Sequence, residues 1–363
     1  MKKMIALLLS LFAVQTALAE LHVVKEKLDL EAAKNFAVDR LEGGYSLITV
    51  QNGGRFLLIP AGMDAPDGLD ADIMLLYMPL DNLFVASTST VALMDEIGAL
   101  SAVTQTTYDV EDWYLPSVKQ AVQDGQIAYI GHYKQPDFER IALNPPKLAV
   151  FSTMIEGTPD VREKLDELGI PLLVDSSALE ETPLGRMEWM KLYGVLLDRV
   201  DEAEAAFEKQ AAIVRDLEGF ENTGKTVAFF FINSEGSVVV RASSDYVPKM
   251  IELAGGKYIF DDISDPESNR STVAITMEQF YAAALDADYL VYNATIDAPI
   301  SSVDELLAKS DLFADFKAVK EGNVWCTGKY LYQATDSVGD QIADLHRMLT
   351  GETDGCTFMY KLS

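Results

Sequence analysis

The sequence predicts an α/β protein made of two doubly wound lobes with mostly parallel sheets, joined by one long helix. Three observations support this fold class. At 363 residues the chain is too long for one ordinary domain and fits two of roughly 150 residues each. Short apolar strands alternate with helices before residue 180 and again after residue 223, as βαβ units require. Between the two series lies an almost continuous helical pattern.

The chain begins with the pattern of an export signal. Met1-Lys2-Lys3 is followed by an apolar run, Met4–Val14, and by the small-residue cleavage pattern Ala17–Ala19. The run is shorter than the ~20 residues that span a bilayer. We expect a mature chain from Glu20, cleaved after Ala19 and, because no cysteine stands there, without a lipid anchor. A protein without an anchor would be lost unless an outer membrane retained it, so we expect it in the periplasm.

The first lobe is assigned to residues 20–181, after the signal peptide at 1–19. Its start, 22–60, is β-rich because glycine and asparagine clusters break it into four short strands. A helix follows the serines and threonines at 87–90 and ends at Gly98, and an amphipathic helix at 158–170 ends at Gly169. The other predicted strands are 72–78, 82–87, 126–131, 147–152 and 171–175.

The helical segment that joins the lobes is assigned to residues 182–222. Thr182 is its expected N-cap and Pro183 its first helical residue. Gly194 and the Asp198-Arg199 region are expected to split it. The second helix, 201–218, would be about 27 Å long and act as a stiff strut. The second lobe, 223–363, is predicted to have strands at 226–232, 257–260, 288–293 and 323–328, a hairpin at 234–242, and helices at 246–255, 302–322 and 338–351.

Two segments in different halves repeat one pattern. PDFERIALNPPKLAVF (136–151) and TMEQFYAAALDADYLVY (276–292) each place a glutamate, Glu139 or Glu278, at the start of a short helix that leads into an apolar strand. One such glutamate is explained by the helix dipole, which favours a carboxylate near the N-terminus. Recurrence at the same place in both halves instead favours two exposed carboxylates that dock onto arginines of a basic partner.

The charge and the metal-binding side chains exclude several classes of partner. A net charge of −28 disfavours nucleic acid and anionic lipid as partners. We expect a monomer that makes only peripheral contact with a membrane complex. His22, His132 and His346 form no cluster, so no metal site is expected and a metal would arrive inside a chelate. In an oxidising compartment Cys326 and Cys356 are expected to form a disulfide contributing ~3 kcal/mol; two unpaired thiols are the alternative.

Several segments together resemble one known family. These are the two glutamate segments, the strut helix, TPLGRMEWMKLYGVLL (182–197), IELAGGKYIFDD (251–262) and VKEGNVWCTG (319–328). From about residue 80 onward the chain resembles the periplasmic binding proteins for iron complexes, haem and cobalamin that serve type II ABC importers. The resemblance implies a ligand cleft between the lobes and docking of Glu139 and Glu278 onto the permease. It also implies a metal chelate as ligand, with no cofactor of the protein's own.

The ligand is expected at loops after the carboxyl ends of strands, where doubly wound sheets bind ligands. Tyrosine and tryptophan side chains there could stack on a large flat ligand, and arginines could pair with carboxylate or catecholate oxygens. The alternatives are core packing for the aromatics, charge balance for Arg270, and an ion pair with Glu188 or Asp175 for Arg186. The candidate ligand-binding residues are Ser87, Thr88, Tyr108, Trp113, Met154, Arg186, Arg241, Arg270, Thr295, Tyr330 and Tyr332.

The leading functional hypothesis is a periplasmic solute-binding protein that delivers an iron–siderophore or haem to an ABC permease. Cobalamin is the alternative within this class and would favour an aromatic, mainly neutral cleft, whereas an anionic iron chelate needs cationic residues. A chelatase-like enzyme is the competing class, but the sequence has no G-x-S-x-G, P-loop, H-E-x-x-H or strand-linked G-x-G-x-x-G motif. A sensor that presents its ligand to a receptor is the third hypothesis.

Overall fold

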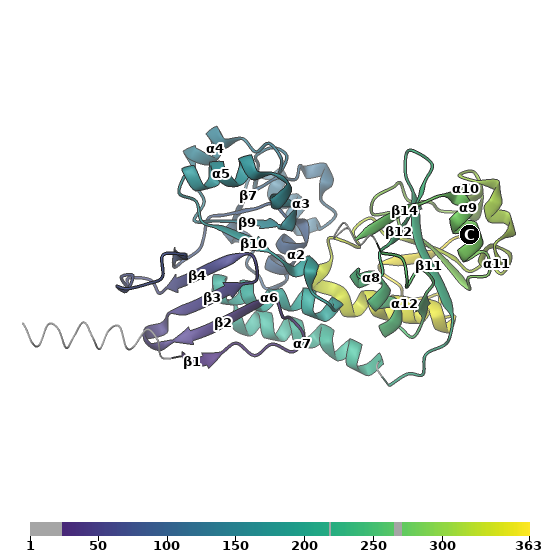
Figure 1. The fold of residues 1–363 in the computed structure, drawn as a ribbon, viewed down its shortest axis with the longest axis horizontal. Helices are drawn as coiled ribbons and strands as arrows, with labels where there is room; N and C mark the ends of the chain where they lie inside the picture. Colours follow the sequence, from purple (N-terminus) through teal and green to yellow (C-terminus); the bar gives the residue numbers. More distant parts are fainter. Residues whose placement is uncertain (1–23, 218, 265–270) are drawn as a thin grey trace, which may run out of the picture. The chain divides into compact units, whose positions relative to one another are not determined.

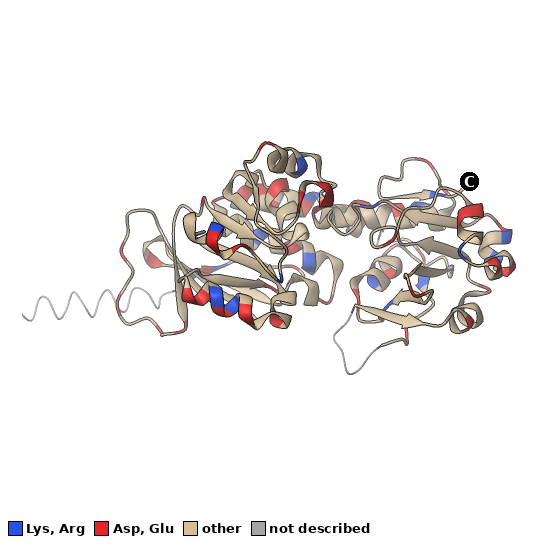
Figure 2. Ribbon diagram, turned by 90° about the horizontal axis from the view of Figure 1, so that it is seen from above, with Lys and Arg blue, Asp and Glu red and all other residues tan. Residues whose placement is uncertain are grey.

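The computed structural model describes residues 24–217, 219–264 and 271–363, which divide into two compact units (Figure 1). Unit 1 comprises the chain up to Glu180 together with Glu188–Glu204, and unit 2 comprises Glu181–Met187 and Ala205–Ser363. The expected signal peptide and Arg270 lie outside the described residues. Within the described part, no helix is both long and apolar enough to cross a membrane. Acidic residues, drawn in red, recur along the helices of both units (Figure 2).

Unit 1 begins with a five-stranded sheet of its own, in the order β1-β2-β3-β4-β5. Every pair is antiparallel except β4–β5, so this sheet differs from the mostly parallel sheets predicted. The reason is local, because turns at Gly43-Gly44 and Asn52-Gly53 reverse the chain too soon for a parallel crossover. Its strands are β1 Val24–Lys27, β2 Phe36–Leu41, β3 Ser46–Val50, β4 Gly54–Ile59 and β5 Ile73–Tyr77.

The second sheet of unit 1 is entirely parallel, in the order β10-β9-β6-β7-β8, and confirms the doubly wound prediction. Phe84, Phe151, Ile141 and Leu165 form part of one buried core under helices α4 and α5. All five carboxyl ends therefore lie along one edge. The elements are β6 Leu83–Val85, α2 Thr88–Glu96, β7 Val103–Thr106, α3 Pro116–Gln123, β8 Ala128–Tyr129, α4 Phe138–Leu143, β9 Leu148–Ser152, α5 Pro159–Glu167 and β10 Leu172–Asp175.

The helical segment has the predicted caps and the predicted break. The hydroxyl of Thr182 accepts the N–H of Gly185 at 3.0 Å, and Asp198 adopts a left-handed φ of 56° between the two helices. A Cβ at Gly194 would lie 2.7 Å from the Cβ of Ala203, so glycine lets the second helix approach the first. The helices are α6 Pro183–Leu197 and α7 Val200–Leu217.

Unit 2 contains a mixed sheet in the order β14-β12-β11-β15-β16-β17, with β13 also paired to β11. The pairs of β11 with β13 and β15, and of β15 with β16, are parallel, whereas β12, β14 and β17 add antiparallel edges. Phe230 lies 4.5 Å, ring centroid to centroid, from Phe280 in the core. The elements are β11 Thr226–Ile232, β12 Val238–Arg241, α8 Tyr246–Leu253, β13 Lys257–Tyr258, β14 Thr272–Ile275, α9 Met277–Ala284, β15 Tyr289–Tyr292, α10 Val303–Leu307, α11 Lys317–Lys320, β16 Val324–Thr327, α12 Val338–Thr350 and β17 Met359–Lys361.

The two cysteines are free thiols, so the predicted disulfide is wrong. Cys326 is buried in β16, where it pairs in register with Tyr360 of β17. The sulfur of Cys356 instead lies 3.9 Å from the backbone oxygen of Asp344 in α12. The side chains thus have different surroundings, a separation that their spacing in the sequence does not reveal. Burial raises the pKa of Cys356 to about 11.

Candidate functional site

The two glutamates predicted to dock onto a permease are both exposed at the start of a helix. Glu139 lies in the first turn of α4, whose N-cap is Asp137. Glu278 lies in the first turn of α9, where Thr276 forms a capping box with Gln279. Hydrogen bonds from its own backbone N–H and from the Thr276 hydroxyl lower the pKa of Glu278. Each carboxylate is therefore available to a partner, and the docking role stays a prediction.

Arg241, at the end of β12, is held by a buried ion pair. Its Nε donates to Asp245 Oδ1 at 2.8 Å and its Nη2 to Asp245 Oδ2 at 2.5 Å, while Asp245 also caps α8. A third bond runs from Nη1 to the hydroxyl of Tyr332 at 3.0 Å. Arg241 is a predicted ligand-binding residue. Its guanidinium is only 7% exposed and is neutralised by Asp245, as a buried charge requires, so contact with a ligand stays a prediction. Its bond to Tyr332 holds that hydroxyl in place.

Three predicted or neighbouring polar residues meet at the same place. Asn293 follows β15 and donates from Nδ2 to the hydroxyl of Tyr332, which follows β16, at 2.8 Å. Thr295 donates from its hydroxyl to Asn293 Oδ1 at 2.6 Å. Because β15 and β16 are parallel, their carboxyl ends bring these loops to one edge of the sheet. The structure thus brings Arg241, Thr295 and Tyr332 together.

Arg186 joins this group from the first turns of α6, within the segment that belongs to unit 2. Its guanidinium carbon lies 4.5 Å from the ring centroid of Tyr246, and that ring lies 6.5 Å from the ring of Tyr332. The Nε of Arg186 is buried and makes no hydrogen bond, and no ion pair to Arg186 exists within the described ranges. We call the following set the arginine–tyrosine cluster: Arg186, Arg241, Asp245, Tyr246, Asn293, Thr295 and Tyr332.

The alternative partners considered for Arg186 are engaged elsewhere. Glu188 accepts backbone N–H groups at residues 31–33, and Asp175 accepts the hydroxyls of Thr90 and Tyr193. Asp245 and Tyr246 were not among the residues predicted for the site. An aspartate that follows a strand and precedes a helix is an N-cap signal, but nothing in the sequence pairs it with Arg241.

The candidates of unit 1 have mixed surroundings. Ser87 is buried as the N-cap of α2, where it accepts the N–H of Thr90, and Thr88 beside it is half-buried. Met154 is 57% exposed after β9. Tyr108 is half-buried, with its ring 5.7 Å from that of Trp113, and burial raises its pKa. Of these residues, Met154 presents the most surface to a ligand.

Trp113 is too enclosed to stack on a ligand, which corrects its predicted role. It is 1% exposed, and its indole N–H points to the backbone oxygen of Tyr108, so it belongs to the core. Thr106 and Thr107, at the end of β7, are buried and their hydroxyls have no hydrogen-bond partner. Neither residue was predicted, because the sequence shows no recognisable strand at β7.

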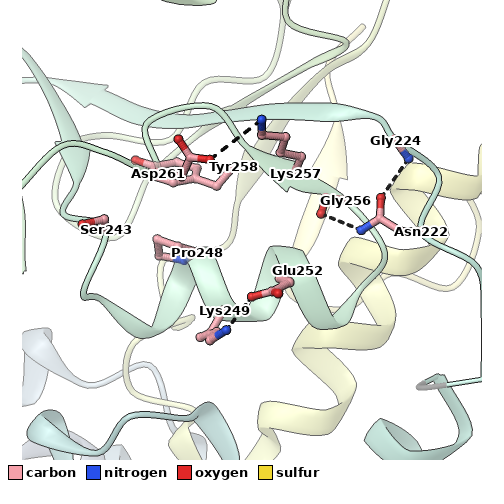
Figure 3. A pocket seen from close by; sticks show the side chains of 10 residues that line it. All are labelled: Asn222, Gly224, Ser243, Pro248, Lys249, Glu252, Gly256, Lys257, Tyr258 and Asp261. Atoms are coloured by element: carbon pink, nitrogen blue, oxygen red, sulfur yellow. Dashed lines mark hydrogen bonds and ion pairs between the residues drawn. The ribbon is translucent and has the colours of Figure 1, made fainter.

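Beside the cluster, unit 2 contains an open groove of about 500 Å³ (Figure 3). Lys257 and Asp261 form an ion pair at 3.8 Å in its wall. Tyr258 links the groove to the cluster, because its hydroxyl accepts the backbone N–H of Arg241 and donates to the carbonyl oxygen of the same residue, both at 2.9 Å. The groove is lined by Asn222, Gly224, Ser243, Pro248, Lys249, Glu252, Gly256, Lys257, Tyr258 and Asp261.

Tyr330, a predicted ligand-binding residue of unit 2, lies apart from the cluster. Tyr330 is half-buried, and its hydroxyl donates to the backbone oxygen of Thr357, so it packs against the C-terminal segment rather than joining the cluster. Among the side chains that the structure describes, no group of three or more His, Cys, Asp or Glu residues is arranged to hold a metal ion.

Some known proteins are similar to this chain in sequence, and others are similar to it in fold. An uncharacterized lipoprotein of Methanocaldococcus jannaschii is 28% identical over 324 residues, covering 85% of this chain and 75% of the relative. A second from the same organism is 25% identical over 334 residues, covering 88% and 83%. A solved haem-binding protein of Pseudomonas aeruginosa has a TM-score of 0.60 at 17% identity, covering 78% of this chain and 98% of that one.

Two other solved structures share the fold. The vitamin B12-binding protein of Vibrio cholerae has a TM-score of 0.55 at 15% identity, covering 76% of this chain and 99% of that one. The petrobactin-binding protein of Bacillus subtilis has a TM-score of 0.59 at 16% identity, covering 74% and 92%. Residues 84–331, well over half of the sequence, match the model of one family. The chain belongs to the periplasmic binding protein family.

Proposed function

We propose that the protein captures an iron chelate, a siderophore complex or haem, and delivers it to the permease of an ABC importer. The observation that supports this proposal is the arginine–tyrosine cluster, which gathers two guanidinium groups, two phenols and an amide at the edge of the unit 2 sheet where the parallel strands β15 and β16 end. Aromatic rings suit a large flat or apolar chelate, and a guanidinium suits its carboxylate or catecholate oxygens. Capture and release without chemical change is the proposed activity.

Cobalamin is the second candidate ligand. The solved vitamin B12-binding protein supports it by fold, and Tyr246 and Tyr332 could pack against a corrin ring. The two candidates are separated by titrating the purified protein with haemin, a ferric catecholate and cyanocobalamin. Tryptophan fluorescence and ligand absorbance would be followed. One-to-one binding of a single class, with the ligand recovered unchanged, supports a carrier. Conversion of the tetrapyrrole would favour the chelatase-like enzyme, and binding of none refutes the proposal.

The proposed permease contact consists of Glu139 and Glu278. Both carboxylates are exposed, and arginines in the permease would pair with them bidentately. The double variant Glu139→Ala, Glu278→Ala is expected to keep ligand affinity and to lose uptake of the labelled chelate in cells. The matched control is Glu163→Ala with Glu352→Ala, which removes one exposed carboxylate from each unit outside the first turns of α4 and α9. Uptake equal to that of the control would refute the docking role.

We propose that the protein is exported and acts outside the cytoplasmic membrane. The family is named for the periplasm, and two relatives are named lipoproteins. Intact-mass analysis of protein purified from its native host tests the predicted start at Glu20. A mass that corresponds to cleavage after Ala19 supports this processing, whereas an added lipid mass supports an anchored protein instead.

A further inference from the structure

We infer that Arg186 selects the charge of the ligand, and that the ligand presents an anionic oxygen to the arginine–tyrosine cluster. This inference rests on the proposed binding function and deepens it, because it narrows the ligand class to chelates with a carboxylate, catecholate or phosphate group. The two arginines of the cluster have different roles, since one is neutralised within the protein and the other is not.

The positive and negative charges of the arginine–tyrosine cluster do not balance. The cluster contains two guanidinium groups, Arg186 and Arg241, but only one carboxylate, Asp245. Asp245 is fully used, because both of its oxygens accept bonds from Arg241 and one also accepts the backbone N–H of Val247. Burial raises the pKa of the Tyr246 and Tyr332 phenols, which are therefore neutral and supply no second negative charge. The cluster retains one positive charge.

That charge resides on a side chain that is held in place and incompletely bonded. The guanidinium of Arg186 stacks on the ring of Tyr246 at 4.5 Å, which fixes its plane while leaving its edge free to bond. Its Nε is buried without an acceptor, an arrangement that costs free energy until an acceptor arrives. An anionic oxygen pair can accept from Nε and Nη together. An acceptor supplied by the ligand would thus satisfy both the charge and the donor.

A neutral ligand could not complete the cluster in this way. It would cover Arg186 and remove water from it without supplying a counter-charge, which is unfavourable for a guanidinium. Arg241 could not compensate, because its own donors are directed to Asp245 and Tyr332. The cluster should therefore distinguish two chelates of the same metal that differ in charge.

The test compares an anionic ferric tris-catecholate with neutral ferrichrome, titrated by quenching of tryptophan fluorescence. Three single variants are used: Arg186→Gln removes the charge, Arg186→Lys keeps it without the planar donor edge, and Arg162→Gln removes an exposed arginine from α5 of unit 1 as the matched control. Circular dichroism and thermal unfolding establish that each variant is folded.

The wild type is expected to bind the anionic chelate more tightly than the neutral one. Arg186→Gln should weaken anionic binding by about ten- to a hundredfold and should strengthen neutral binding, because no guanidinium is then covered without a counter-charge. Arg186→Lys should fall between, and Arg162→Gln should match the wild type. If Arg186→Gln does not fold, Arg186→Lys carries the comparison. Unaltered anionic binding in the Arg186 variants, or a preference of the wild type for ferrichrome, overturns the inference while the carrier function stands. A wild type that binds neither chelate, haemin nor cyanocobalamin overturns the proposed function itself.

Discussion

Glu188 of α6 forms hydrogen bonds with the segment that connects β1 and β2 of the N-terminal sheet. Its removal should destabilise unit 1 strongly. Its carboxylate is fully buried in α6 and also contacts the ammonium group of Lys191 at 3.0 Å. Three consecutive backbone N–H groups between β1 and β2 donate to it, each at 2.8 Å. The donors are those of Glu31, Ala32 and Ala33.

The magnitude follows from what Glu188→Ala would leave unpaired. Each N–H left without an acceptor costs about 1–3 kcal/mol when it is buried, but Glu31 is exposed and Ala32 half-buried, so water can replace part of the loss. Lys191 keeps Glu204 at 3.3 Å as a second carboxylate. We therefore expect the free energy of unfolding to fall by about 3–5 kcal/mol, a large share of the about 5–15 kcal/mol typical of a domain.

The assay is urea unfolding followed by tryptophan fluorescence, with Trp189 reporting on unit 1. Glu167→Ala is the control, because it removes an exposed ion pair with Lys164 and should cost less than about 1 kcal/mol. Glu188→Gln keeps the shape and one acceptor oxygen, so it should fall between the two. A Glu188→Ala variant as stable as the control would refute the reasoning, since the N-terminal sheet would then be held by other contacts.

Three further predictions concern unit 2. Asp245→Ala should lower its free energy of unfolding by about 3–5 kcal/mol in urea, because the buried Arg241 loses its counter-charge; a change below about 1 kcal/mol would contradict the ion pair. Burial alone would raise the pKa of Asp288, but hydrogen bonds from Lys317 and Thr226 outweigh it and lower the pKa. A lowered folded-state pKa gives stability that is present above the unfolded value of about 3.9 and is lost as the pH falls through the folded value. The acid-induced loss of stability should therefore be smaller in Asp288→Asn, and an unchanged pH profile would count against this. Finally, denatured, unreduced protein should show two reactive thiols, and native protein should react slowly at Cys356 below pH 9; a disulfide in the purified protein would overturn the assignment.

Local patterns were sufficient for much of the fold. The apolar run 226–232 predicts a strand from its own hydrophobicity, and the structure has β11 there. The break predicted near Gly194 is also local, because this glycine lets α7 approach α6. Strand β7 escaped detection because VTQT is short and three of its four residues are polar, so its burial comes from its neighbours β6 and β8 rather than from its own composition.

Pairings between distant residues could not be predicted in the same way. Arg241 lies in the hairpin predicted at 234–242 and Tyr332 follows the strand predicted at 323–328, but the sequence does not show that Asp245 neutralises the arginine before any ligand arrives. Trp113 was expected to stack on a ligand, yet its ring is enclosed by the core of unit 1. The contact between the N-terminal segment and α6 is made through Glu188, whose partners lie far away along the chain.

That distance sets an order of events during synthesis. Glu31 and its acceptor are 157 positions apart, so the ribosome must add all of the intervening residues before the bond can form. At about 5–20 residues per second the delay is about ten to thirty seconds. During this time β1–β5 can pair with one another but have no anchor, and their edges are open to other chains. Lys25 and Lys27 of β1 carry positive charge on one of those edges. Until α6 has been synthesised, these charges would oppose edge-to-edge pairing of the sheet with other chains.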